Sequence, residues 1–154
     1  MHRFLNSIWY HKNHPVSLFL TPLSWVFVLG VSVKAFLYRA GFLRTKSVGC
    51  PVIVVGNIAV GGTGKTPLVV WLANQLLVAG YRPGIIARGY GGAARTWPQQ
   101  VRPDSDPTAV GEESVLLARS VECPVAVGPD RVAAAQALRI YNNCDVIVSD
   151  DGLQ

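Results

Sequence analysis

Apolar and polar positions follow two different patterns along the chain, and the change falls near residue 47. Residues 16–33 (VSLFLTPLSWVFVLGVSV) contain no charged side chain. As a helix they would span about 27 Å, close to the hydrocarbon thickness of about 30 Å. Later in the chain, short β-branched runs alternate with longer amphipathic stretches. The pattern predicts a hydrophobic, helical N-terminal segment over 1–47 and an α/β domain over 48–154.

Basic residues flank the hydrophobic run on both sides, and more of them follow it than precede it. Arg3 and Lys12 come before the run, and Lys34, Arg39, Arg44 and Lys46 come after it. Excess positive charge after a hydrophobic segment favours a cytoplasmic position for the rest of the chain. The run is therefore interpreted as membrane-associated, either spanning the bilayer or lying in its interface. A buried core helix is the alternative.

The second region has the sequence pattern of a parallel sheet covered by helices. Runs such as PVIVVG and DVIVSDDG are typical of buried strands, and KTPLVVWLANQLLVAG is typical of a helix. Their alternation predicts a parallel sheet with helices on both faces. The strands are expected at 51–56, 82–88, 124–128 and 145–152, and the helices at 65–80, 111–121 and 129–141. Residues 91–110 are expected to form a long loop, which is a candidate for substrate contact.

A glycine-rich stretch, VVGNIAVGGTGKTPLVV, lies between the first strand and the first helix of this region. It resembles the phosphate-binding pattern G-x-x-x-x-G-K-[ST], with Ala59 in place of the first glycine. Lys65 would reach the β- and γ-phosphates of a nucleotide, and the Thr66 hydroxyl would bind Mg²⁺. A glycine-rich turn without a ligand is the alternative, but the strand–loop–helix context favours the site. The predicted nucleotide-binding residues are Ala59, Val60, Gly61, Gly62, Thr63, Gly64, Lys65 and Thr66.

Two adjacent acids, Asp150 and Asp151, end the last predicted strand. Ligands of open α/β sheets bind at the carboxyl ends of strands, where an acid can hold Mg²⁺ directly or through water. Taken alone, two acids could form a solvated turn. Together with a phosphate loop they are interpreted as metal ligands.

Basic and acidic residues are unevenly distributed along the chain. Residues 1–103 contain eleven Lys or Arg and no acid, whereas 104–154 contain three Arg and nine acids. The basic part favours an anionic partner, such as a phospholipid surface or a phosphorylated substrate. Nucleic acid is disfavoured because the basic residues are scattered among apolar runs without an RNA-binding pattern. The three scattered cysteines are interpreted as reduced thiols.

The motifs VGNIAVGGTGKTP, RGYGG, GEES, PVAVGPDR and DDGLQ, in this order after a basic hydrophobic segment, resemble the tetraacyldisaccharide 4'-kinase family of the lipid A pathway. The resemblance covers essentially the whole chain, and the family usually has a small residue where Ala59 stands. It implies ATP- and Mg²⁺-dependent phosphorylation of the 4'-hydroxyl of an acylated disaccharide 1-phosphate. This would occur at the cytoplasmic face of the inner membrane of a Gram-negative bacterium.

Two site residues follow from the resemblance. The family motif G-D-E-P reads GEES here, so Glu112 takes the place of the acid that assists deprotonation of the acceptor hydroxyl. Glutamate keeps the carboxylate but is one methylene longer, and stabilising a helix N-terminus is its alternative role. Arg88, in RGYGG, is a candidate contact for an anionic substrate, with a solvated loop arginine as the alternative.

The family continues well beyond the length of this chain. The chain is therefore expected to be a truncated form that binds nucleotide weakly and transfers little phosphate unaided, with a sheet edge left open at the last strand. A membrane-associated regulatory or partitioning ATPase is the main alternative, although the second lysine of that class is absent. A GTPase is weaker, because no N-K-x-D motif occurs. A non-catalytic membrane-binding fragment is the third alternative.

Overall fold

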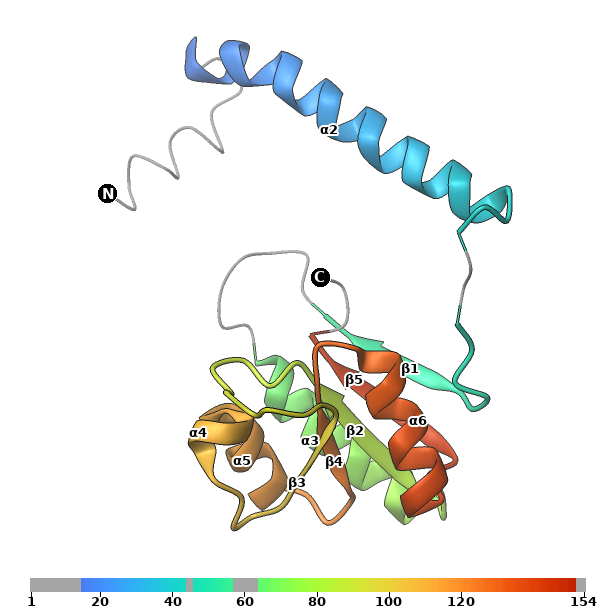
Figure 1. The fold of residues 1–154 in the computed structure, drawn as a ribbon, viewed down its shortest axis with the longest axis vertical. Helices are drawn as coiled ribbons and strands as arrows, with labels where there is room; N and C mark the ends of the chain where they lie inside the picture. The colour runs from blue at the N-terminus through green and yellow to red at the C-terminus, as the bar shows by residue number, and fades with distance from the viewer. Residues whose placement is uncertain (1–14, 44–45, 57–63, 152–154) are drawn as a thin grey trace. The chain divides into compact units, whose positions relative to one another are not determined.

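The computed structural model describes residues 15–43, 46–56 and 64–151 of the chain. The chain divides into two compact units, residues 1–45 and 46–154. The first unit contains α2 (Pro15–Arg39), a helix of 25 residues with Pro22 inside it (Figure 1). Its side chains from Ser24 to Phe36 are exposed, including Trp25 and Phe27, which are 74% and 72% exposed. No helix in the described part of the chain is long and apolar enough to cross a membrane.

The second unit is built on one five-stranded sheet with the order β1-β5-β2-β4-β3 (Figure 1). Four strands are parallel, and β3 is antiparallel to β4. The strands are β1 (Val52–Val55), β2 (Pro83–Ala87), β3 (Gln99–Val101), β4 (Val125–Val127) and β5 (Val146–Asp150). The predicted α/β fold with a largely parallel sheet is therefore confirmed.

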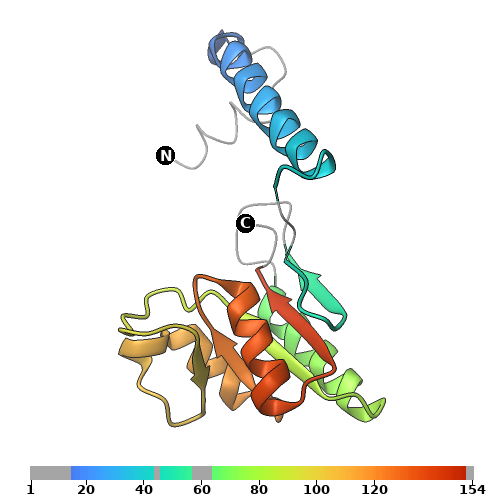
Figure 2. The ribbon, with the colours of Figure 1, turned by 45° about the vertical axis from the view of Figure 1, so that its right-hand side comes forward.

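Helices cover both faces of this sheet (Figure 2). The helices are α3 (Lys65–Val78), α4 (Pro107–Val110), α5 (Glu112–Arg119) and α6 (Arg131–Asn142). On one face, Val69 and Ala73 of α3 share a core with Val115 and Leu117 of α5. On the other face of the sheet, Leu138 of α6 belongs to a second core, which includes Ile147 of β5. Helices on both faces match the prediction.

Strand β5 shows how the two cores share the sheet. Its five residues are all buried, and successive side chains point to opposite faces. Val148 packs in the core beneath α3 and α5, whereas Ile147 packs in the core beneath α6. A strand buried on both faces reads as a continuous apolar run, which is why VIV was recognisable in the sequence.

Two expectations are wrong. Residues 91–110 are not one structureless loop, because they contain β3 and α4, whose first helical turn is capped by the Asp106 side chain. The last strand does not end the sheet either, since β5 lies between β1 and β2. The outer strands are β1 and β3. The crossover from β4 through α6 carries the chain past β2 to this position, so the order of strands in space differs from their order along the chain.

Candidate nucleotide-binding site

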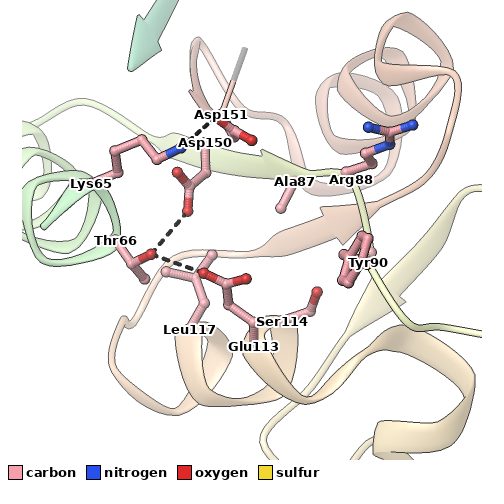
Figure 3. A pocket seen from close by; sticks show the side chains of 11 residues that line it. Lys65, Thr66, Ala87, Arg88, Tyr90, Glu113, Ser114, Leu117, Asp150 and Asp151 are labelled. Atoms are coloured by element: carbon pink, nitrogen blue, oxygen red, sulfur yellow. Dashed lines mark hydrogen bonds and ion pairs between the residues drawn. The ribbon is translucent and has the colours of Figure 1, made fainter. Parts of the chain in front are cut away.

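A pocket of about 310 Å³ opens where β2 and β5 end and α3 begins (Figure 3). Parallel strands place their carboxyl ends at one edge of the sheet, so residues distant in sequence meet there. Four segments contribute the lining: the start of α3, the turn after β2, the first turns of α5, and the end of β5. The lining residues are Lys65, Thr66, Ala87, Arg88, Gly89, Tyr90, Glu113, Ser114, Leu117, Asp150 and Asp151.

Lys65 and Thr66 occupy the first turn of α3, directly after its N-cap residue Gly64. The Lys65 ammonium forms an ion pair with Asp151, at 2.5 Å between Nζ and Oδ1, and the two side chains are 22% and 35% exposed. The Thr66 hydroxyl lies 3.4 Å from Oδ2 of Asp150. The structure therefore joins the lysine and threonine of the predicted phosphate loop to the two predicted metal ligands. The other loop residues, Ala59 to Thr63, lie outside the described residues, and their role stays a prediction.

Glu113 completes a cluster of oxygen atoms around Thr66. Its Oε1 lies 3.2 Å from the Thr66 hydroxyl, on the side opposite Asp150 in Figure 3. Burial raises the pKa of Asp150 above its ordinary value of 3.8, and the nearby Glu113 and Asp151 charges raise it further. The Thr66 hydrogen bond and the Lys65 charge act in the opposite direction on this pKa. Two carboxylates held together in a partly buried pocket favour a cation between them.

The donor set fits Mg²⁺, because hydroxyl and carboxylate oxygens are the ligands this ion prefers. Within the ranges that the structure describes, no group of three or more His, Cys, Asp or Glu side chains has the spacing of a metal site. The candidate ligands are instead one hydroxyl and two carboxylates, those of Thr66, Glu113 and Asp150, with Asp151 beside them. So small a protein set is usual for Mg²⁺, which keeps water and phosphate oxygens as its remaining ligands.

The two glutamates at the start of α5 differ in the cavities that they line. Glu113 lines the pocket with Lys65, whereas Glu112 does not. Glu112 lines an adjoining groove of about 680 Å³, together with Glu113, the turn after β2 and the start of α4. Successive helical residues point about 100° apart, so a pair of adjacent acids divides between two surfaces. The catalytic role of Glu112 stays a prediction, and Glu113 is a site residue that the sequence reasoning missed.

Arg88 and Tyr90 lie across the pocket from Lys65, on the turn that follows β2 (Figure 3). No ion pair joins Arg88 to a carboxylate among the described residues, in contrast to Arg82, which pairs with Asp145. An arginine of this kind in a pocket is suited to an anionic ligand. Tyr90 is 83% exposed and borders both the pocket and the adjoining groove. Sequence reasoning missed Tyr90, although it stands in the RGYGG motif.

The turn carrying Tyr90 is fastened to the segment that precedes α5. The Ala93 and Ala94 amides donate to the carbonyls of Thr108 and Ala109, at 2.9 and 3.1 Å. Gly111, the residue before Glu112, has φ 91° and ψ 138°. A Cβ atom there would lie 2.4 Å from the Tyr90 carbonyl oxygen, so the two segments touch through their backbones. The positions of Glu112 and Glu113 therefore depend on this contact.

Comparisons with known proteins identify the family of the chain. Residues 16–154 match the family model described as tetraacyldisaccharide-1-P 4'-kinase, LpxK. The chain is 56% identical over 146 residues to the tetraacyldisaccharide 4'-kinase of Nitrosococcus oceani, covering 95% of this chain and 43% of that protein. It is 57% identical over 135 residues to the enzyme of that name from Alkalilimnicola ehrlichii, covering 88% and 40% of the two chains.

A solved structure shows the same fold. The crystal structure of the "apo" form of LpxK from Aquifex aeolicus in complex with ATP superposes with a TM-score of 0.72 and 31% sequence identity. The match covers 88% of this chain and 44% of that one. This chain thus spans less than half the length of each relative compared. On the family match, the shared identities and the fold, the chain belongs to the tetraacyldisaccharide-1-P 4'-kinase family.

Proposed function

We propose that this chain carries the nucleotide-binding half of a kinase that transfers the γ-phosphate of ATP to the 4'-hydroxyl of tetraacyldisaccharide 1-phosphate. The observation that carries the proposal is the meeting of a phosphate-loop lysine with a hydroxyl and three carboxylates at one edge of a parallel sheet. The residues are Lys65, Thr66, Glu113, Asp150 and Asp151. The named relatives and the ATP-bound Aquifex aeolicus structure support the assignment.

Lys65 binds the nucleotide by exchanging partners. In the structure its ammonium is paired with Asp151. The β- and γ-phosphates of ATP, lying at the N-terminus of α3, attract the same ammonium and the positive end of the helix dipole. Because the ion pair is only partly buried, breaking it costs about 1 kcal/mol or less. Lys65 then lies where negative charge develops on the transferred phosphoryl group.

Thr66, Glu113 and Asp150 would hold Mg²⁺ beside these phosphates. When bound, the ion neutralises charge on the phosphate oxygens. The protein's own contribution is positional: the buried β5 fixes Asp150, the first turn of α3 fixes Thr66, and α5 brings Glu113 across the pocket. Holding the three oxygens in place beforehand lowers the entropic cost of assembling the site.

The acceptor sugar binds in the groove that adjoins the pocket. Glu112 accepts the proton of the 4'-hydroxyl as the hydroxyl oxygen bonds to the γ-phosphorus, while the bond from this phosphorus to the β–γ bridging oxygen breaks and ADP leaves. Glu112 and Glu113 are neighbours on α5, so the acceptor and the nucleotide meet across one shared wall. Arg88 contacts an anionic group of the substrate or nucleotide from the far side of the pocket.

Helix α2 keeps the protein at the lipid surface that holds its acylated substrate. The helix exposes Trp25, Phe27 and Phe36, at 74%, 72% and 65%. Apolar side chains beside an acid-free, basic sequence suit an anionic bilayer, and we place the chain at the cytoplasmic face of the inner membrane.

Transfer of labelled γ-phosphate from ATP to tetraacyldisaccharide 1-phosphate, in detergent micelles, tests the proposal. This chain is assayed alone and joined to the remaining part of the Nitrosococcus oceani relative, each with a Lys65→Ala control. Label transfer in the joined protein that Lys65→Ala abolishes supports the kinase. ATP hydrolysis without transfer in both would overturn it in favour of an ATPase.

Two matched variants separate the roles of the adjacent acids. Glu113→Gln should raise the Mg²⁺ concentration needed for half-maximal rate. Glu112→Gln should lower kcat by about 100-fold with little change in that concentration, since general-base contributions are typically of this order. The same Mg²⁺ dependence in both variants would contradict the separate roles.

A further inference from the structure

Residues 46–51, the first residues of the second unit, lie along helix α6 before the chain turns back into β1 (Figure 1). The Lys46 ammonium lies 3.5 Å from Oδ2 of Asp130, the N-cap residue of α6. Further along, Nη1 of Arg139 donates a hydrogen bond to the Val48 carbonyl at 3.1 Å. Asp130 and Arg139 are separated by about 13.5 Å along the helix axis, so the segment follows most of α6. We call residues 46–51 the strap.

The strap also contributes side chains to the core beneath α6. Val48 and Cys50 are partly buried, and both pack against the core that contains Leu138 and Ile147. Residues two apart in an extended segment point to the same side, which explains why these two face the core together. The strap is therefore packed on the second unit.

Gly49, between these two residues, lies directly beneath the Arg139 guanidinium. Its φ is 80°, and a Cβ atom there would lie 2.9 Å from Cζ of Arg139 and closer still to Nη1. The Gly49 amide donates to the Ser47 hydroxyl oxygen at 3.2 Å, which stabilises the turn. Glycine is suited to this position because it combines a left-handed φ with room for the guanidinium above it.

Arg139 is the main polar contact that holds the strap. The Lys46–Asp130 ion pair has side chains that are 67% and 55% exposed, and exposed pairs of this kind contribute little. The hydrogen bond from Arg139 to Val48 has a charged donor, and such bonds are stronger than those between neutral groups. The guanidinium thus acts as a clasp over the turn at Gly49.

The strap begins at the edge of the sheet that holds the nucleotide pocket. Helix α6 follows β4, so its N-terminus lies at the carboxyl edge of the parallel strands, where the pocket of Lys65 and Asp150 opens. Lys46 contacts the N-cap residue of this helix. The chain that comes from α2 therefore enters the second unit at this edge.

We propose that Arg139 is a positioning residue, which clasps the strap to α6 and fixes where the chain from α2 enters the kinase domain. This role rests on the proposed function, in which α2 holds the protein at the lipid surface. With the strap closed, residues 40–45 separate α2 from the fixed part of the domain; with the strap open, residues 40–51 do. The connection is then twice as long. Effective concentration falls roughly as the −3/2 power of connection length, so opening lowers it about threefold at the lipid surface.

Thiol labelling of Cys50 measures opening of the strap without nucleotide or lipid. Cys50 lies in the strap and is partly buried, whereas Cys123 and Cys144 are buried elsewhere in the core. Arg139→Gln should speed the labelling of Cys50 in the native 154-residue chain by up to about tenfold, because it removes a hydrogen bond with a charged donor. Continued protection of Cys123 and Cys144 would show that the variant is folded.

Two matched variants accompany this measurement. Arg82→Gln is the control, since Arg82 lines the same groove as Arg139 but pairs with Asp145, and it should leave the Cys50 rate unchanged. Arg139→Lys keeps the charge without the planar fork, so it should restore only part of the protection.

A double-mutant cycle tests whether the guanidinium acts at Gly49. Gly49→Ala should displace Arg139, because the guanidinium is the end of a flexible side chain, and should itself speed the labelling of Cys50. The backbone strain of Gly49→Ala is present with either residue at position 139, so it cancels in the cycle. In the Gly49→Ala background, Arg139→Gln should therefore change the Cys50 rate less than about twofold.

Kinetics of the chain joined to the remaining part of the Nitrosococcus oceani relative test the positioning role. Arg139→Gln should raise the KM for tetraacyldisaccharide 1-phosphate in lipid vesicles about threefold and leave the KM for ATP unchanged. A merely structural defect would instead reduce the amount of active protein, which lowers kcat and leaves both KM values as they are.

Three results would overturn the inference. Cys50 labelling that is no faster in Arg139→Gln than in Arg82→Gln would remove the clasp, and so would additive effects of Gly49→Ala and Arg139→Gln. An unchanged KM for the lipid beside faster labelling would remove the positioning role. Failure of the proposed function would look different, as no phosphate transfer by any version of the joined protein, and the Cys50 rates would still decide on the clasp.

Discussion

Replacing Gly111 by alanine should be among the most damaging single-methyl additions in this domain. Two costs combine at this position. With φ 91° and ψ 138°, the backbone is in a region that residues with a Cβ rarely adopt, at a cost of about 1–3 kcal/mol. The added Cβ would also lie 2.4 Å from the Tyr90 carbonyl oxygen, a backbone atom held by its own loop. Overpacking of this kind costs about 1–3 kcal/mol.

Two nearby glycines separate these costs. Gly91 has φ 79° but nothing within 4 Å of an added methyl group, so Gly91→Ala should cost only about 1 kcal/mol for its backbone conformation. Gly92 has no positive φ, but its Cβ would lie 2.5 Å from the Ala109 carbonyl oxygen, so Gly92→Ala should show the contact cost alone. Gly111→Ala should approach the sum of the two costs, about 2–6 kcal/mol.

Urea unfolding of the three variants, followed by circular dichroism, measures the differences. Comparable m-values would confirm that the unfolded states match. A Gly111→Ala variant that loses no more stability than Gly91→Ala would refute the reasoning, because the contact with the Tyr90 carbonyl would then contribute nothing. Where Gly111→Ala is folded, its Mg²⁺-dependent nucleotide binding should also weaken, since Glu113 follows Gly111 by two residues.

Three further outcomes are expected. Because the folded-state pKa of Asp150 is raised above 3.8, the ionised side chain opposes folding. In Mg²⁺-free buffer, Asp150→Asn should therefore raise the Tm at neutral pH, and this gain in Tm should shrink as the pH falls toward 3.8. A gain in Tm that grows as the pH falls would contradict a raised pKa. Burial raises the pKa of Cys123 and Cys144 to about 11, so at pH near 8 a thiol reagent should label only Cys50 in the native chain and all three cysteines in denaturant. Rapid labelling of Cys123 or Cys144 in the native chain would contradict their burial. Leu138→Ala should lower the free energy of unfolding in urea by about 2–5 kcal/mol, because Leu138 lies on the buried face of α6 and is 1% exposed. A loss below about 1 kcal/mol would show that the core collapses around the gap.

The sequence predicted the elements whose pattern is set by burial. Strand β5 and helix α3 are long enough for apolar periodicity to identify them, and both lie where expected. Strand β3 was missed because it has three residues, two of them glutamines, and pairs only through β4. A strand so short and polar carries no hydrophobic pattern, and its backbone bonds alone define it.

The position of β5 could not be read from the sequence either, since spatial order depends on which strands the crossovers join. The same limit applies to the acids of α5. Sequence alone places Glu112 and Glu113 at a helix start, but the rotation of α5 against the sheet decides which one faces Thr66. That rotation is set by the packing of Val115 and Leu117 in the core, at 2% and 1% exposure.

The central place of β5 also has a consequence for synthesis of the protein. Strand β1 bonds to β5 alone among the described strands, through pairs such as Val52 with Ile147, which are 95 residues apart in the chain. Until β5 leaves the ribosome, at about 5–20 residues per second, β1 has no partner among these strands. Closing so long a loop makes sheet formation slow compared with local helix formation. The strand that supplies Asp150 is thus also the one that joins the halves of the sheet, so a nascent chain gains its stable fold and the carboxylate proposed to hold Mg²⁺ in a single step.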